Sequence, residues 1–147
     1  RAEWEANPVW AAVQGELRAA REACTAAGAR FLFVYLPSKP EVLLPFVKPD
    51  PALARRTIEF LGNPAPEGPA EALWATLIAE RGAQEALLRE FCARESIPFL
   101  STRPALEAQA ARGELGYLTT DTHWQSLGQA ALLEPLLAFL REQGALD

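Results

Sequence analysis

His123, the only histidine of the chain, follows Asp121 by two positions in the segment 119–124. A histidine has an ordinary pKa near neutrality, so it can accept a proton and return it within one catalytic cycle. Residues i and i+2 of an extended or turn segment point the same way, so we expect the Asp121 carboxylate to reach Nδ1 and leave Nε2 free to act on a hydroxyl. The pair therefore supplies two of the three groups of a Ser-His-Asp triad.

Two other interpretations of the same residues are open. An aspartate two positions before a histidine also forms local turns and caps, and a single histidine is often a structural residue. A metal site is disfavoured, because zinc requires three or four ligands and the chain offers one histidine and two distant cysteines, Cys24 and Cys92. We expect no metal and no cofactor.

Composition indicates one globular domain and excludes several classes of partner. The chain has 147 residues, of which 50% are hydrophobic and 22% charged, which is enough for a substantial core. A net charge of -5 without a basic cluster argues against nucleic acid as a partner. No apolar run approaches the length of a membrane span, and no signal peptide is recognisable. Because the sequence contains no methionine, we expect it to be part of a longer protein.

The first elements predicted are a helix and a buried strand. Asn7 and Pro8 begin the helix, with the proline at its first position, and Gly28 ends it. Residues 31–36 form a continuous apolar run with aromatic and β-branched members, which Pro37 ends. Such a run is typical of a strand buried on both faces and therefore of a parallel sheet in an α/β protein.

The other segments predict further helices and a second strand. We expect helices at 51–61, at 70–95 with a break near Gly82, and at 102–111, a strand at 97–101, and a last helix that Ser126 and Gln129 begin as a capping box. Residues 1–7 are expected to be irregular, the prolines at 45, 49 and 51 to form a rigid connector, and residues 61–69 to form a surface loop or lid. Two strands are few for such a sheet, so we expect the others in another part of the protein or in a partner chain.

Ser38 and Lys39 directly follow the first predicted strand. The carboxyl ends of strands carry the site in open α/β sheets, so both residues stand where chemistry is expected. Ser38 is a candidate nucleophile. Prolines flank this segment, however, whereas a nucleophile elbow uses small residues for its sharp turn. The pattern therefore favours a turn cap, or an anchor for a loop.

These motifs together resemble the SGNH (GDSL-type) hydrolase superfamily. The resemblance covers roughly residues 16–140 and is closest to the acetyltransferase-like members related to alginate O-acetylation proteins, in which an aspartate, one residue and the catalytic histidine precede a tryptophan, as in Asp121-Thr122-His123-Trp124. It implies a three-layer flavodoxin-like α/β fold with a parallel sheet, present here in part, with few strands and many helices. It also implies serine-dependent hydrolysis or transfer of an ester acyl group. His123 is then the general base and Asp121 its orienting partner.

The chain departs from this family at the nucleophile. None of its four serines lies in a Gly-Asp-Ser block, and the oxyanion-hole glycine and the Gly-x-Asn-Asp block are missing. We therefore expect residues 1–147 to be a single partial domain, inactive alone, whose serine and oxyanion hole come from the remainder of the protein, upstream or downstream.

The expected substrate is an acyl ester, probed most simply as an acetyl ester, or a carbohydrate that carries one. The alternatives are a non-catalytic binding or assembly module that retains the fold, and a chance match of the Asp-x-His pattern. Trp124 is expected to pack and fix the loop, and Thr120 and Thr122 to hold the carboxylate.

Overall fold

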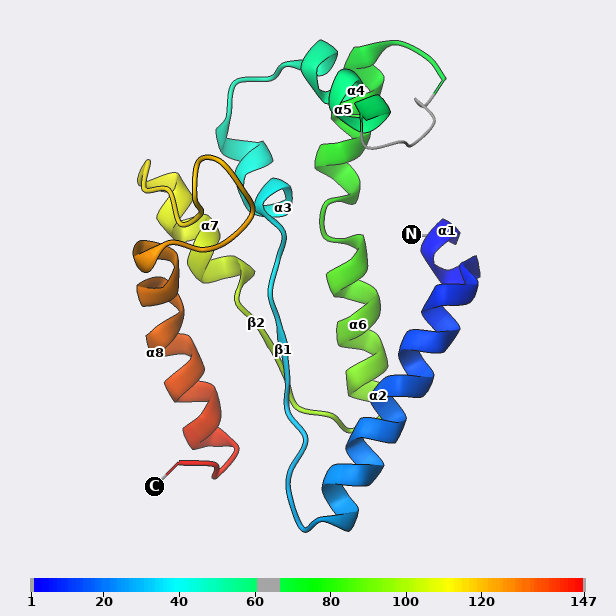
Figure 1. The fold of residues 1–147 in the computed structure, drawn as a ribbon, viewed down its shortest axis with the longest axis vertical. Helices are drawn as coiled ribbons and strands as arrows, with labels where there is room; N and C mark the ends of the chain where they lie inside the picture. The colour runs from blue at the N-terminus through cyan, green and yellow to red at the C-terminus, as the bar shows by residue number, and fades with distance from the viewer. Residues whose placement is uncertain (1, 61–66, 147) are drawn as a thin grey trace.

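The computed structural model describes residues 2–60 and 67–146, and these form a mixed α/β structure in which helices surround a small parallel sheet (Figure 1). The elements in chain order are α1 (Ala2–Ala6), α2 (Pro8–Ala26), β1 (Phe33–Tyr35), α3 (Lys39–Leu43), the 3-10 helix η1 (Leu44–Phe46), α4 (Pro51–Phe60), α5 (Ala70–Glu80), α6 (Ala83–Arg94), β2 (Phe99–Ser101), α7 (Arg103–Ala111) and α8 (Ser126–Glu142). None of the helices in these ranges is long and apolar enough to cross a membrane.

The predicted parallel sheet is confirmed. β1 pairs with β2 in parallel, with Phe33 opposite Phe99 and Tyr35 opposite Ser101. The facing rings of Phe33 and Phe99 stack with their centroids 5.6 Å apart, an arrangement that adds to the burial of both rings. Both strands end at the same edge of the sheet, and the segments that follow them, α3 and α7, begin there.

Helices α2 and α6 cover one face of the sheet (Figure 1). Phe91 and Cys92 of α6 are completely buried there, and Phe33 and Phe99 pack against them from the strands. The rings of Trp10 and Phe91 meet in a T-shaped arrangement at a centroid distance of 6.0 Å, which connects α2 to the same cluster.

A second cluster lies beyond the carboxyl ends of the strands. Its buried members are Val42 of α3, Leu106 of α7, Tyr117 of the following loop and Leu132 of α8. Because these four residues come from four different segments, the cluster fixes the positions of α3, α7 and α8 relative to the loop that contains His123.

Most of the predicted elements are present. The helix from Pro8 has Asn7 as its N-cap, the long helical region breaks between Glu80 and Ala83, and both strands form within their predicted ranges. The prediction of a strand buried on both faces holds only in part, because Phe33 and Val34 are half-buried whereas Tyr35 is buried.

One local prediction is wrong. Residues 2–6 are helical rather than irregular, because alanine and glutamate favour helix and Glu3 and Glu5 stand in its first turn. The predicted connector begins with η1, which contains Pro45, and residues 47–50 have no helix or strand. Helix α3, which was not predicted, precedes it, and Pro40 in its first turn needs no N–H. Of the predicted loop or lid at 61–69, residues 61–66 lie outside the described residues.

The predicted capping box at the start of the last helix is also wrong. Gln125, not Ser126, is the N-cap of α8, and it makes no side-chain capping hydrogen bond. The N–H of Gln125 donates to the Gly116 carbonyl at 3.0 Å, and its side-chain amide donates to Leu115. These bonds hold Gln125 in an extended conformation. Ser126 is therefore the first residue of the helix rather than its N-cap.

Gly116 and Gly128 allow α8 to contact the chain that enters the His123 loop. A Cβ at Gly128 would overlap the Gly116 carbonyl oxygen and lie 2.9 Å from its carbonyl carbon. A Cβ at Gly116 would lie 3.3 Å from the Gly128 Cα. Only two glycines permit backbones to approach so closely.

Gly128→Ala is therefore expected to destabilise the protein by about 2 kcal/mol, since backbone must move to admit the methyl group. The measurement is the free energy of unfolding in urea.

Gly15→Ala is the matched control, because Gly15 also lies inside a helix but has nothing within 4 Å of the added methyl group. It is expected to raise stability by up to about 1 kcal/mol through helix propensity. Equal effects of the two substitutions would contradict the close-approach argument.

Candidate acid–base site at the His123 loop

His123 lies on a short loop between α7 and α8 that is closed at its base. Tyr117 and Trp124 form an isolated antiparallel bridge, and the N–H of Leu118 donates to the His123 carbonyl at 2.8 Å. Residues 118–123 are therefore a tight loop whose two ends are joined by backbone hydrogen bonds, which positions His123 at a defined place next to the bridge.

The structure brings Asp121 and His123 together as their spacing predicts. One carboxylate oxygen of Asp121, Oδ1, accepts the His123 backbone N–H at 2.7 Å and lies 3.3 Å from the imidazole Nδ1. The same oxygen thus makes the local turn and faces the ring, so this geometry is compatible with both interpretations of the motif. The His123 side chain is 83% exposed, and its Nε2 is turned away from Asp121 and available to a reacting group.

The loop keeps Asp121 ionised. The backbone N–H of His123 is the main cause of a lowered pKa for this carboxyl group, and the imidazole and the Lys39 ammonium add to it. A carboxylate facing Nδ1 favours the tautomer with the proton on Nδ1, which leaves the Nε2 lone pair free to accept a proton.

An open hollow of about 380 Å³ lies beside the imidazole. The residues that line it are Leu36, Pro37, Thr122, His123, Trp124 and Gln129. In the described part of the chain no serine or cysteine lines this hollow, so His123 has no nucleophile of its own there. The hollow is at the carboxyl end of β1, which is where α/β sheets place their sites.

The structure places Ser38 at the N-cap of α3, which agrees with the prediction of a turn cap. The Glu41 carboxylate accepts the Ser38 N–H at 2.7 Å, as the N3 residue of a capping box does. The spacing Ser38-Lys39-Pro40-Glu41 is an S-x-x-E pattern, so the sequence contains a signal for the start of this helix that the spacing of its apolar residues does not give.

Lys39 reaches across to the His123 loop. Its Nζ donates to the Leu118 carbonyl at 2.6 Å, to the Asp121 carbonyl at 3.1 Å and to the Thr119 carbonyl at 3.3 Å. An ammonium group has three donors, so all three are directed at this one loop. Thr120 and Thr122 were expected to hold the carboxylate, but neither donates to Asp121 among the described residues; Lys39 holds the loop instead.

Trp124 and Tyr117 fix the base of the loop. Trp124 packs against the cluster of Val42, Leu106, Tyr117 and Leu132, which is the packing role predicted for it. Tyr117 is 1% exposed, and its hydroxyl donates to the Pro37 carbonyl at 3.0 Å. Burial raises the pKa of Tyr117 to about 12, so the hydroxyl remains a donor throughout the neutral range.

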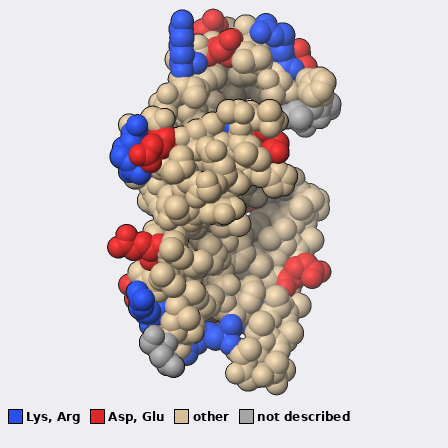
Figure 2. Space-filling view, turned by 60° about the vertical axis from the view of Figure 1, so that its left-hand side comes forward, with Lys and Arg blue, Asp and Glu red and all other residues tan. Residues whose placement is uncertain are grey.

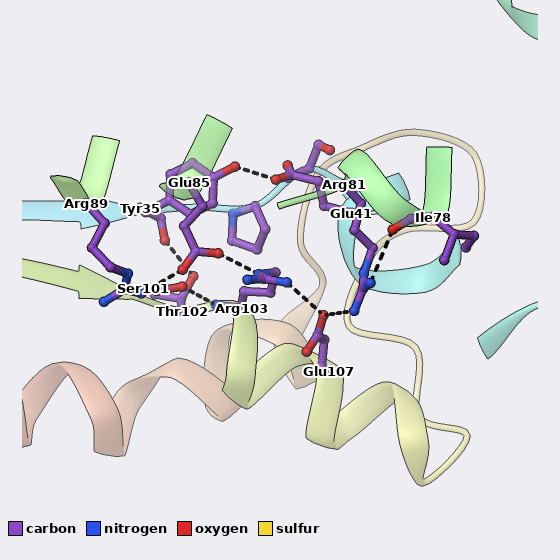
Figure 3. A network of polar contacts seen from close by, with 12 residues as sticks. Tyr35, Glu41, Ile78, Arg81, Glu85, Arg89, Ser101, Thr102, Arg103 and Glu107 are labelled. Atoms are coloured by element: carbon purple, nitrogen blue, oxygen red, sulfur yellow. Dashed lines mark hydrogen bonds and ion pairs between the residues drawn. The ribbon is translucent and has the colours of Figure 1, made fainter. Parts of the chain in front are cut away.

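A network of polar contacts surrounds the carboxyl ends of the two strands (Figure 3). The Tyr35 hydroxyl donates to the Glu41 carboxylate, and the Thr102 hydroxyl donates to the Tyr35 carbonyl at 2.9 Å. Burial raises the pKa of Tyr35 well above its ordinary value, and the adjacent Glu41 carboxylate adds to the effect. Both strand ends are thereby connected to α3, the helix that carries Lys39.

Glu85 of α6 is the buried charge of this network. It accepts from Arg89 at 2.7 Å and from Arg103 Nε at 2.5 Å, and only 4% of its side chain is exposed. Burial alone would raise the pKa of Glu85, but hydrogen bonds from Arg89, Ser101 and Arg103 outweigh it, and the pKa is lowered. Glu85 therefore stays charged and joins α6 to the start of α7.

The described residues do not form a metal site. Among residues 2–60 and 67–146, no three side chains of His, Cys, Asp or Glu are grouped as metal ligands. Cys24 and Cys92 are unpaired thiols on α2 and α6, and burial raises the pKa of Cys92 to about 11. Such a thiol is inert at neutral pH.

Comparisons of the chain with models of protein families, with curated proteins and with solved structures found no match.

Glu85→Gln is expected to lower the free energy of unfolding by about 3 kcal/mol, because Arg103 loses the carboxylate that compensates its burial. Urea unfolding at neutral pH measures it. In the matched control, Glu114→Gln, the lost pair with Arg112 lies at the surface, and we expect no measurable change. If Glu85→Gln leaves the free energy of unfolding unchanged, the network contributes nothing to stability.

Asp121 is expected to titrate below the ordinary aspartate pKa. Its contribution to stability is then fully present above the pKa of the unfolded chain and is lost as the pH falls through the lower folded pKa. Carboxyl carbon NMR with labelled aspartate measures the titration, and Asp121→Asn identifies the signal. A pKa at or above the ordinary value would contradict the hydrogen bond from the His123 N–H.

Proposed function

We propose that His123 and Asp121 are the base and the orienting acid of a Ser-His-Asp triad in an SGNH-type ester hydrolase or O-acyltransferase. The observation that carries the proposal is the Asp121 oxygen that lies 3.3 Å from Nδ1 of an exposed imidazole whose Nε2 is free. The nucleophilic serine and the oxyanion donors come from outside these 147 residues. Their place is the hollow beside His123.

The chemistry follows from this geometry. Nε2 removes the proton of the serine hydroxyl as its oxygen attacks the ester carbonyl, and the imidazolium then returns that proton to the departing alcohol. Water or a sugar hydroxyl repeats the same proton transfers and releases the acyl group. Asp121 remains ionised throughout, because its carboxylate stabilises the imidazolium and keeps the ring in the required tautomer.

The second face of the sheet supports a fold that continues beyond this sequence. Phe33 and Phe99 face α2 and α6, so Val34 and Leu100 point to the opposite face, where both remain half-buried. A flavodoxin-like sheet has further strands beside these two and helices on both faces. Within residues 2–60 and 67–146, β1 and β2 pair only with each other, so neither has a second strand partner.

Exposed apolar side chains lie near the hollow beside His123. Leu36 at the end of β1 is 55% exposed and lines the hollow, and Leu133 of α8 is 60% exposed. Leu133 follows Gln129 by one helical turn, so it lies on the side of α8 that faces the hollow. Figure 2 shows that uncharged residues cover most of the face on this side and that charged side chains gather toward its ends and edges. Such a surface is suited to burial against another part of the protein.

The proposed substrate is an acyl ester, including an ester carried by a carbohydrate. The hollow is small and open, and its walls combine apolar groups with the hydroxyl of Thr122 and the amide of Gln129, which can donate to and accept from a neutral polar ligand. Acetyl esters are therefore the natural first substrates to test.

In the protein expressed from its complete gene, His123→Ala is expected to lower the rate of p-nitrophenyl acetate hydrolysis by about a hundredfold or more, because the serine loses its base. Asp121→Asn is expected to reduce the rate as well, with the fold intact by circular dichroism.

Ser38→Ala is the matched control, since Ser38 is an N-cap outside the hollow and its loss is expected to leave the rate unchanged. A fluorophosphonate probe, followed by peptide mass spectrometry, identifies the reactive serine. The proposal fails if His123→Ala retains full activity. A protein that neither hydrolyses the ester nor reacts with the probe supports the alternative of a non-catalytic module that keeps the fold.

A further inference from the structure

The Lys39 ammonium group lies where three backbone carbonyls converge. Three backbone carbonyls of the His123 loop, those of Leu118, Thr119 and Asp121, converge on its Nζ within 3.3 Å. Backbone carbonyls that point at one another repel, so the loop requires a positive centre to hold this shape. The ammonium group supplies that centre, and it supplies N–H donors with it.

The backbone next to Lys39 is also fixed by hydrogen bonds. The Glu41 carboxylate accepts from the Ser38 N–H with one oxygen and from the Tyr35 hydroxyl with the other. The backbone on either side of Lys39 is therefore attached to the end of β1. The side chain then spans from this fixed point to a loop about 80 positions later in the sequence.

The carbonyls that Lys39 contacts belong to the turn that orients the imidazole. Asp121 contributes its backbone carbonyl to Lys39 and its side-chain Oδ1 to His123. A displacement of the Asp121 backbone therefore moves the carboxylate away from both the N–H and the Nδ1 of His123. The orientation of the ring depends on the Lys39 contacts.

We propose that Lys39 is a positioning residue for the acid–base pair: its ammonium group organises the three carbonyls and so holds Asp121 against the His123 ring. The proposal rests on the proposed function for its catalytic meaning. Its test is made without substrate, so a wrong assignment of the activity leaves the result interpretable.

The composition of the chain makes the test direct. The 147 residues contain one histidine and two lysines, Lys39 and Lys48. In NMR spectra, labelled histidine therefore gives the backbone and ring signals of His123 alone. Labelled lysine gives two ammonium signals. Lys48 lines a different hollow, between η1, α4 and α5, and provides the matched control. In the parent protein, the Lys39 ammonium is expected to exchange slowly with water and to give a resolved signal that Lys39→Met removes and Lys48→Met retains.

Two properties of His123 are then compared in Lys39→Ala and Lys48→Ala. Hydrogen exchange of the His123 backbone N–H is expected to accelerate about tenfold in Lys39→Ala, because the hydrogen bond from this N–H to Asp121 is weakened. It is expected to stay unchanged in Lys48→Ala. The ring nitrogen signals are expected to lose the preference for the Nδ1–H tautomer in Lys39→Ala alone. Circular dichroism confirms that both variants are folded.

Rescue separates positioning from charge. Propylammonium supplies the atoms that Lys39→Ala removes and is expected to restore slow exchange and the Nδ1–H tautomer, whereas tetramethylammonium has the same charge and no N–H donor and is expected to restore neither. The proposal is overturned if the parent protein has no slowly exchanging Lys39 ammonium, or if Lys39→Ala leaves the His123 signals as they are. Equal rescue by the two ions overturns it as well.

Discussion

The attachment of the His123 loop to the end of β1 determines the geometry of the candidate site. Tyr117 donates to the carbonyl of Pro37, and Lys39 donates to three carbonyls of residues 118–121, so two side chains join segments that are far apart in the sequence. One contact is buried and uncharged, and the other is exposed and charged. Together they hold His123 against the hollow at the end of β1, although the loop itself contains little regular structure.

The buried charge of Glu85 in α6 contributes to the position of the strand end to which this loop is attached. An isolated buried carboxylate is costly, and apolar residues would fill the space around Glu85 with less desolvation. The pairing of Glu85 with Arg89 and Arg103 nevertheless fixes the start of α7 relative to α6, and Thr102 beside it holds the end of β1. Charges are oriented by the direction of their hydrogen bonds, so such a network defines the position of a strand end more narrowly than apolar packing does.

The sequence predicted the elements better than the connections between them. Local chemistry determined several of these features: Pro8 begins α2, Gly28 adopts the positive φ that follows its end, and the apolar run before Pro37 forms a strand. The two-residue spacing of Asp121 and His123 predicted their contact for the same reason. The partners of Lys39 lie about 80 positions away, and the approach of Gly116 to Gly128 brings a loop onto a separate helix, so both depend on tertiary packing that no local pattern encodes. The Ser126 cap failed because long-range bonds to Gln125 overrode a local preference.

The parallel pairing of β1 with β2 has a consequence for the order in which the molecule assembles. Tyr35 and Thr102, which meet at the strand ends, are 67 positions apart, so their pairing requires closure of a long chain segment, whereas helices such as α6 form from neighbouring residues. The His123 loop is held by Lys39 of α3, and α3 is attached to the end of β1 through Glu41 and Tyr35. We therefore expect the helices to form first, the two strands to pair next, and the His123 loop to reach its final shape last, because its contacts with Lys39 require α3 to be in place at the end of β1.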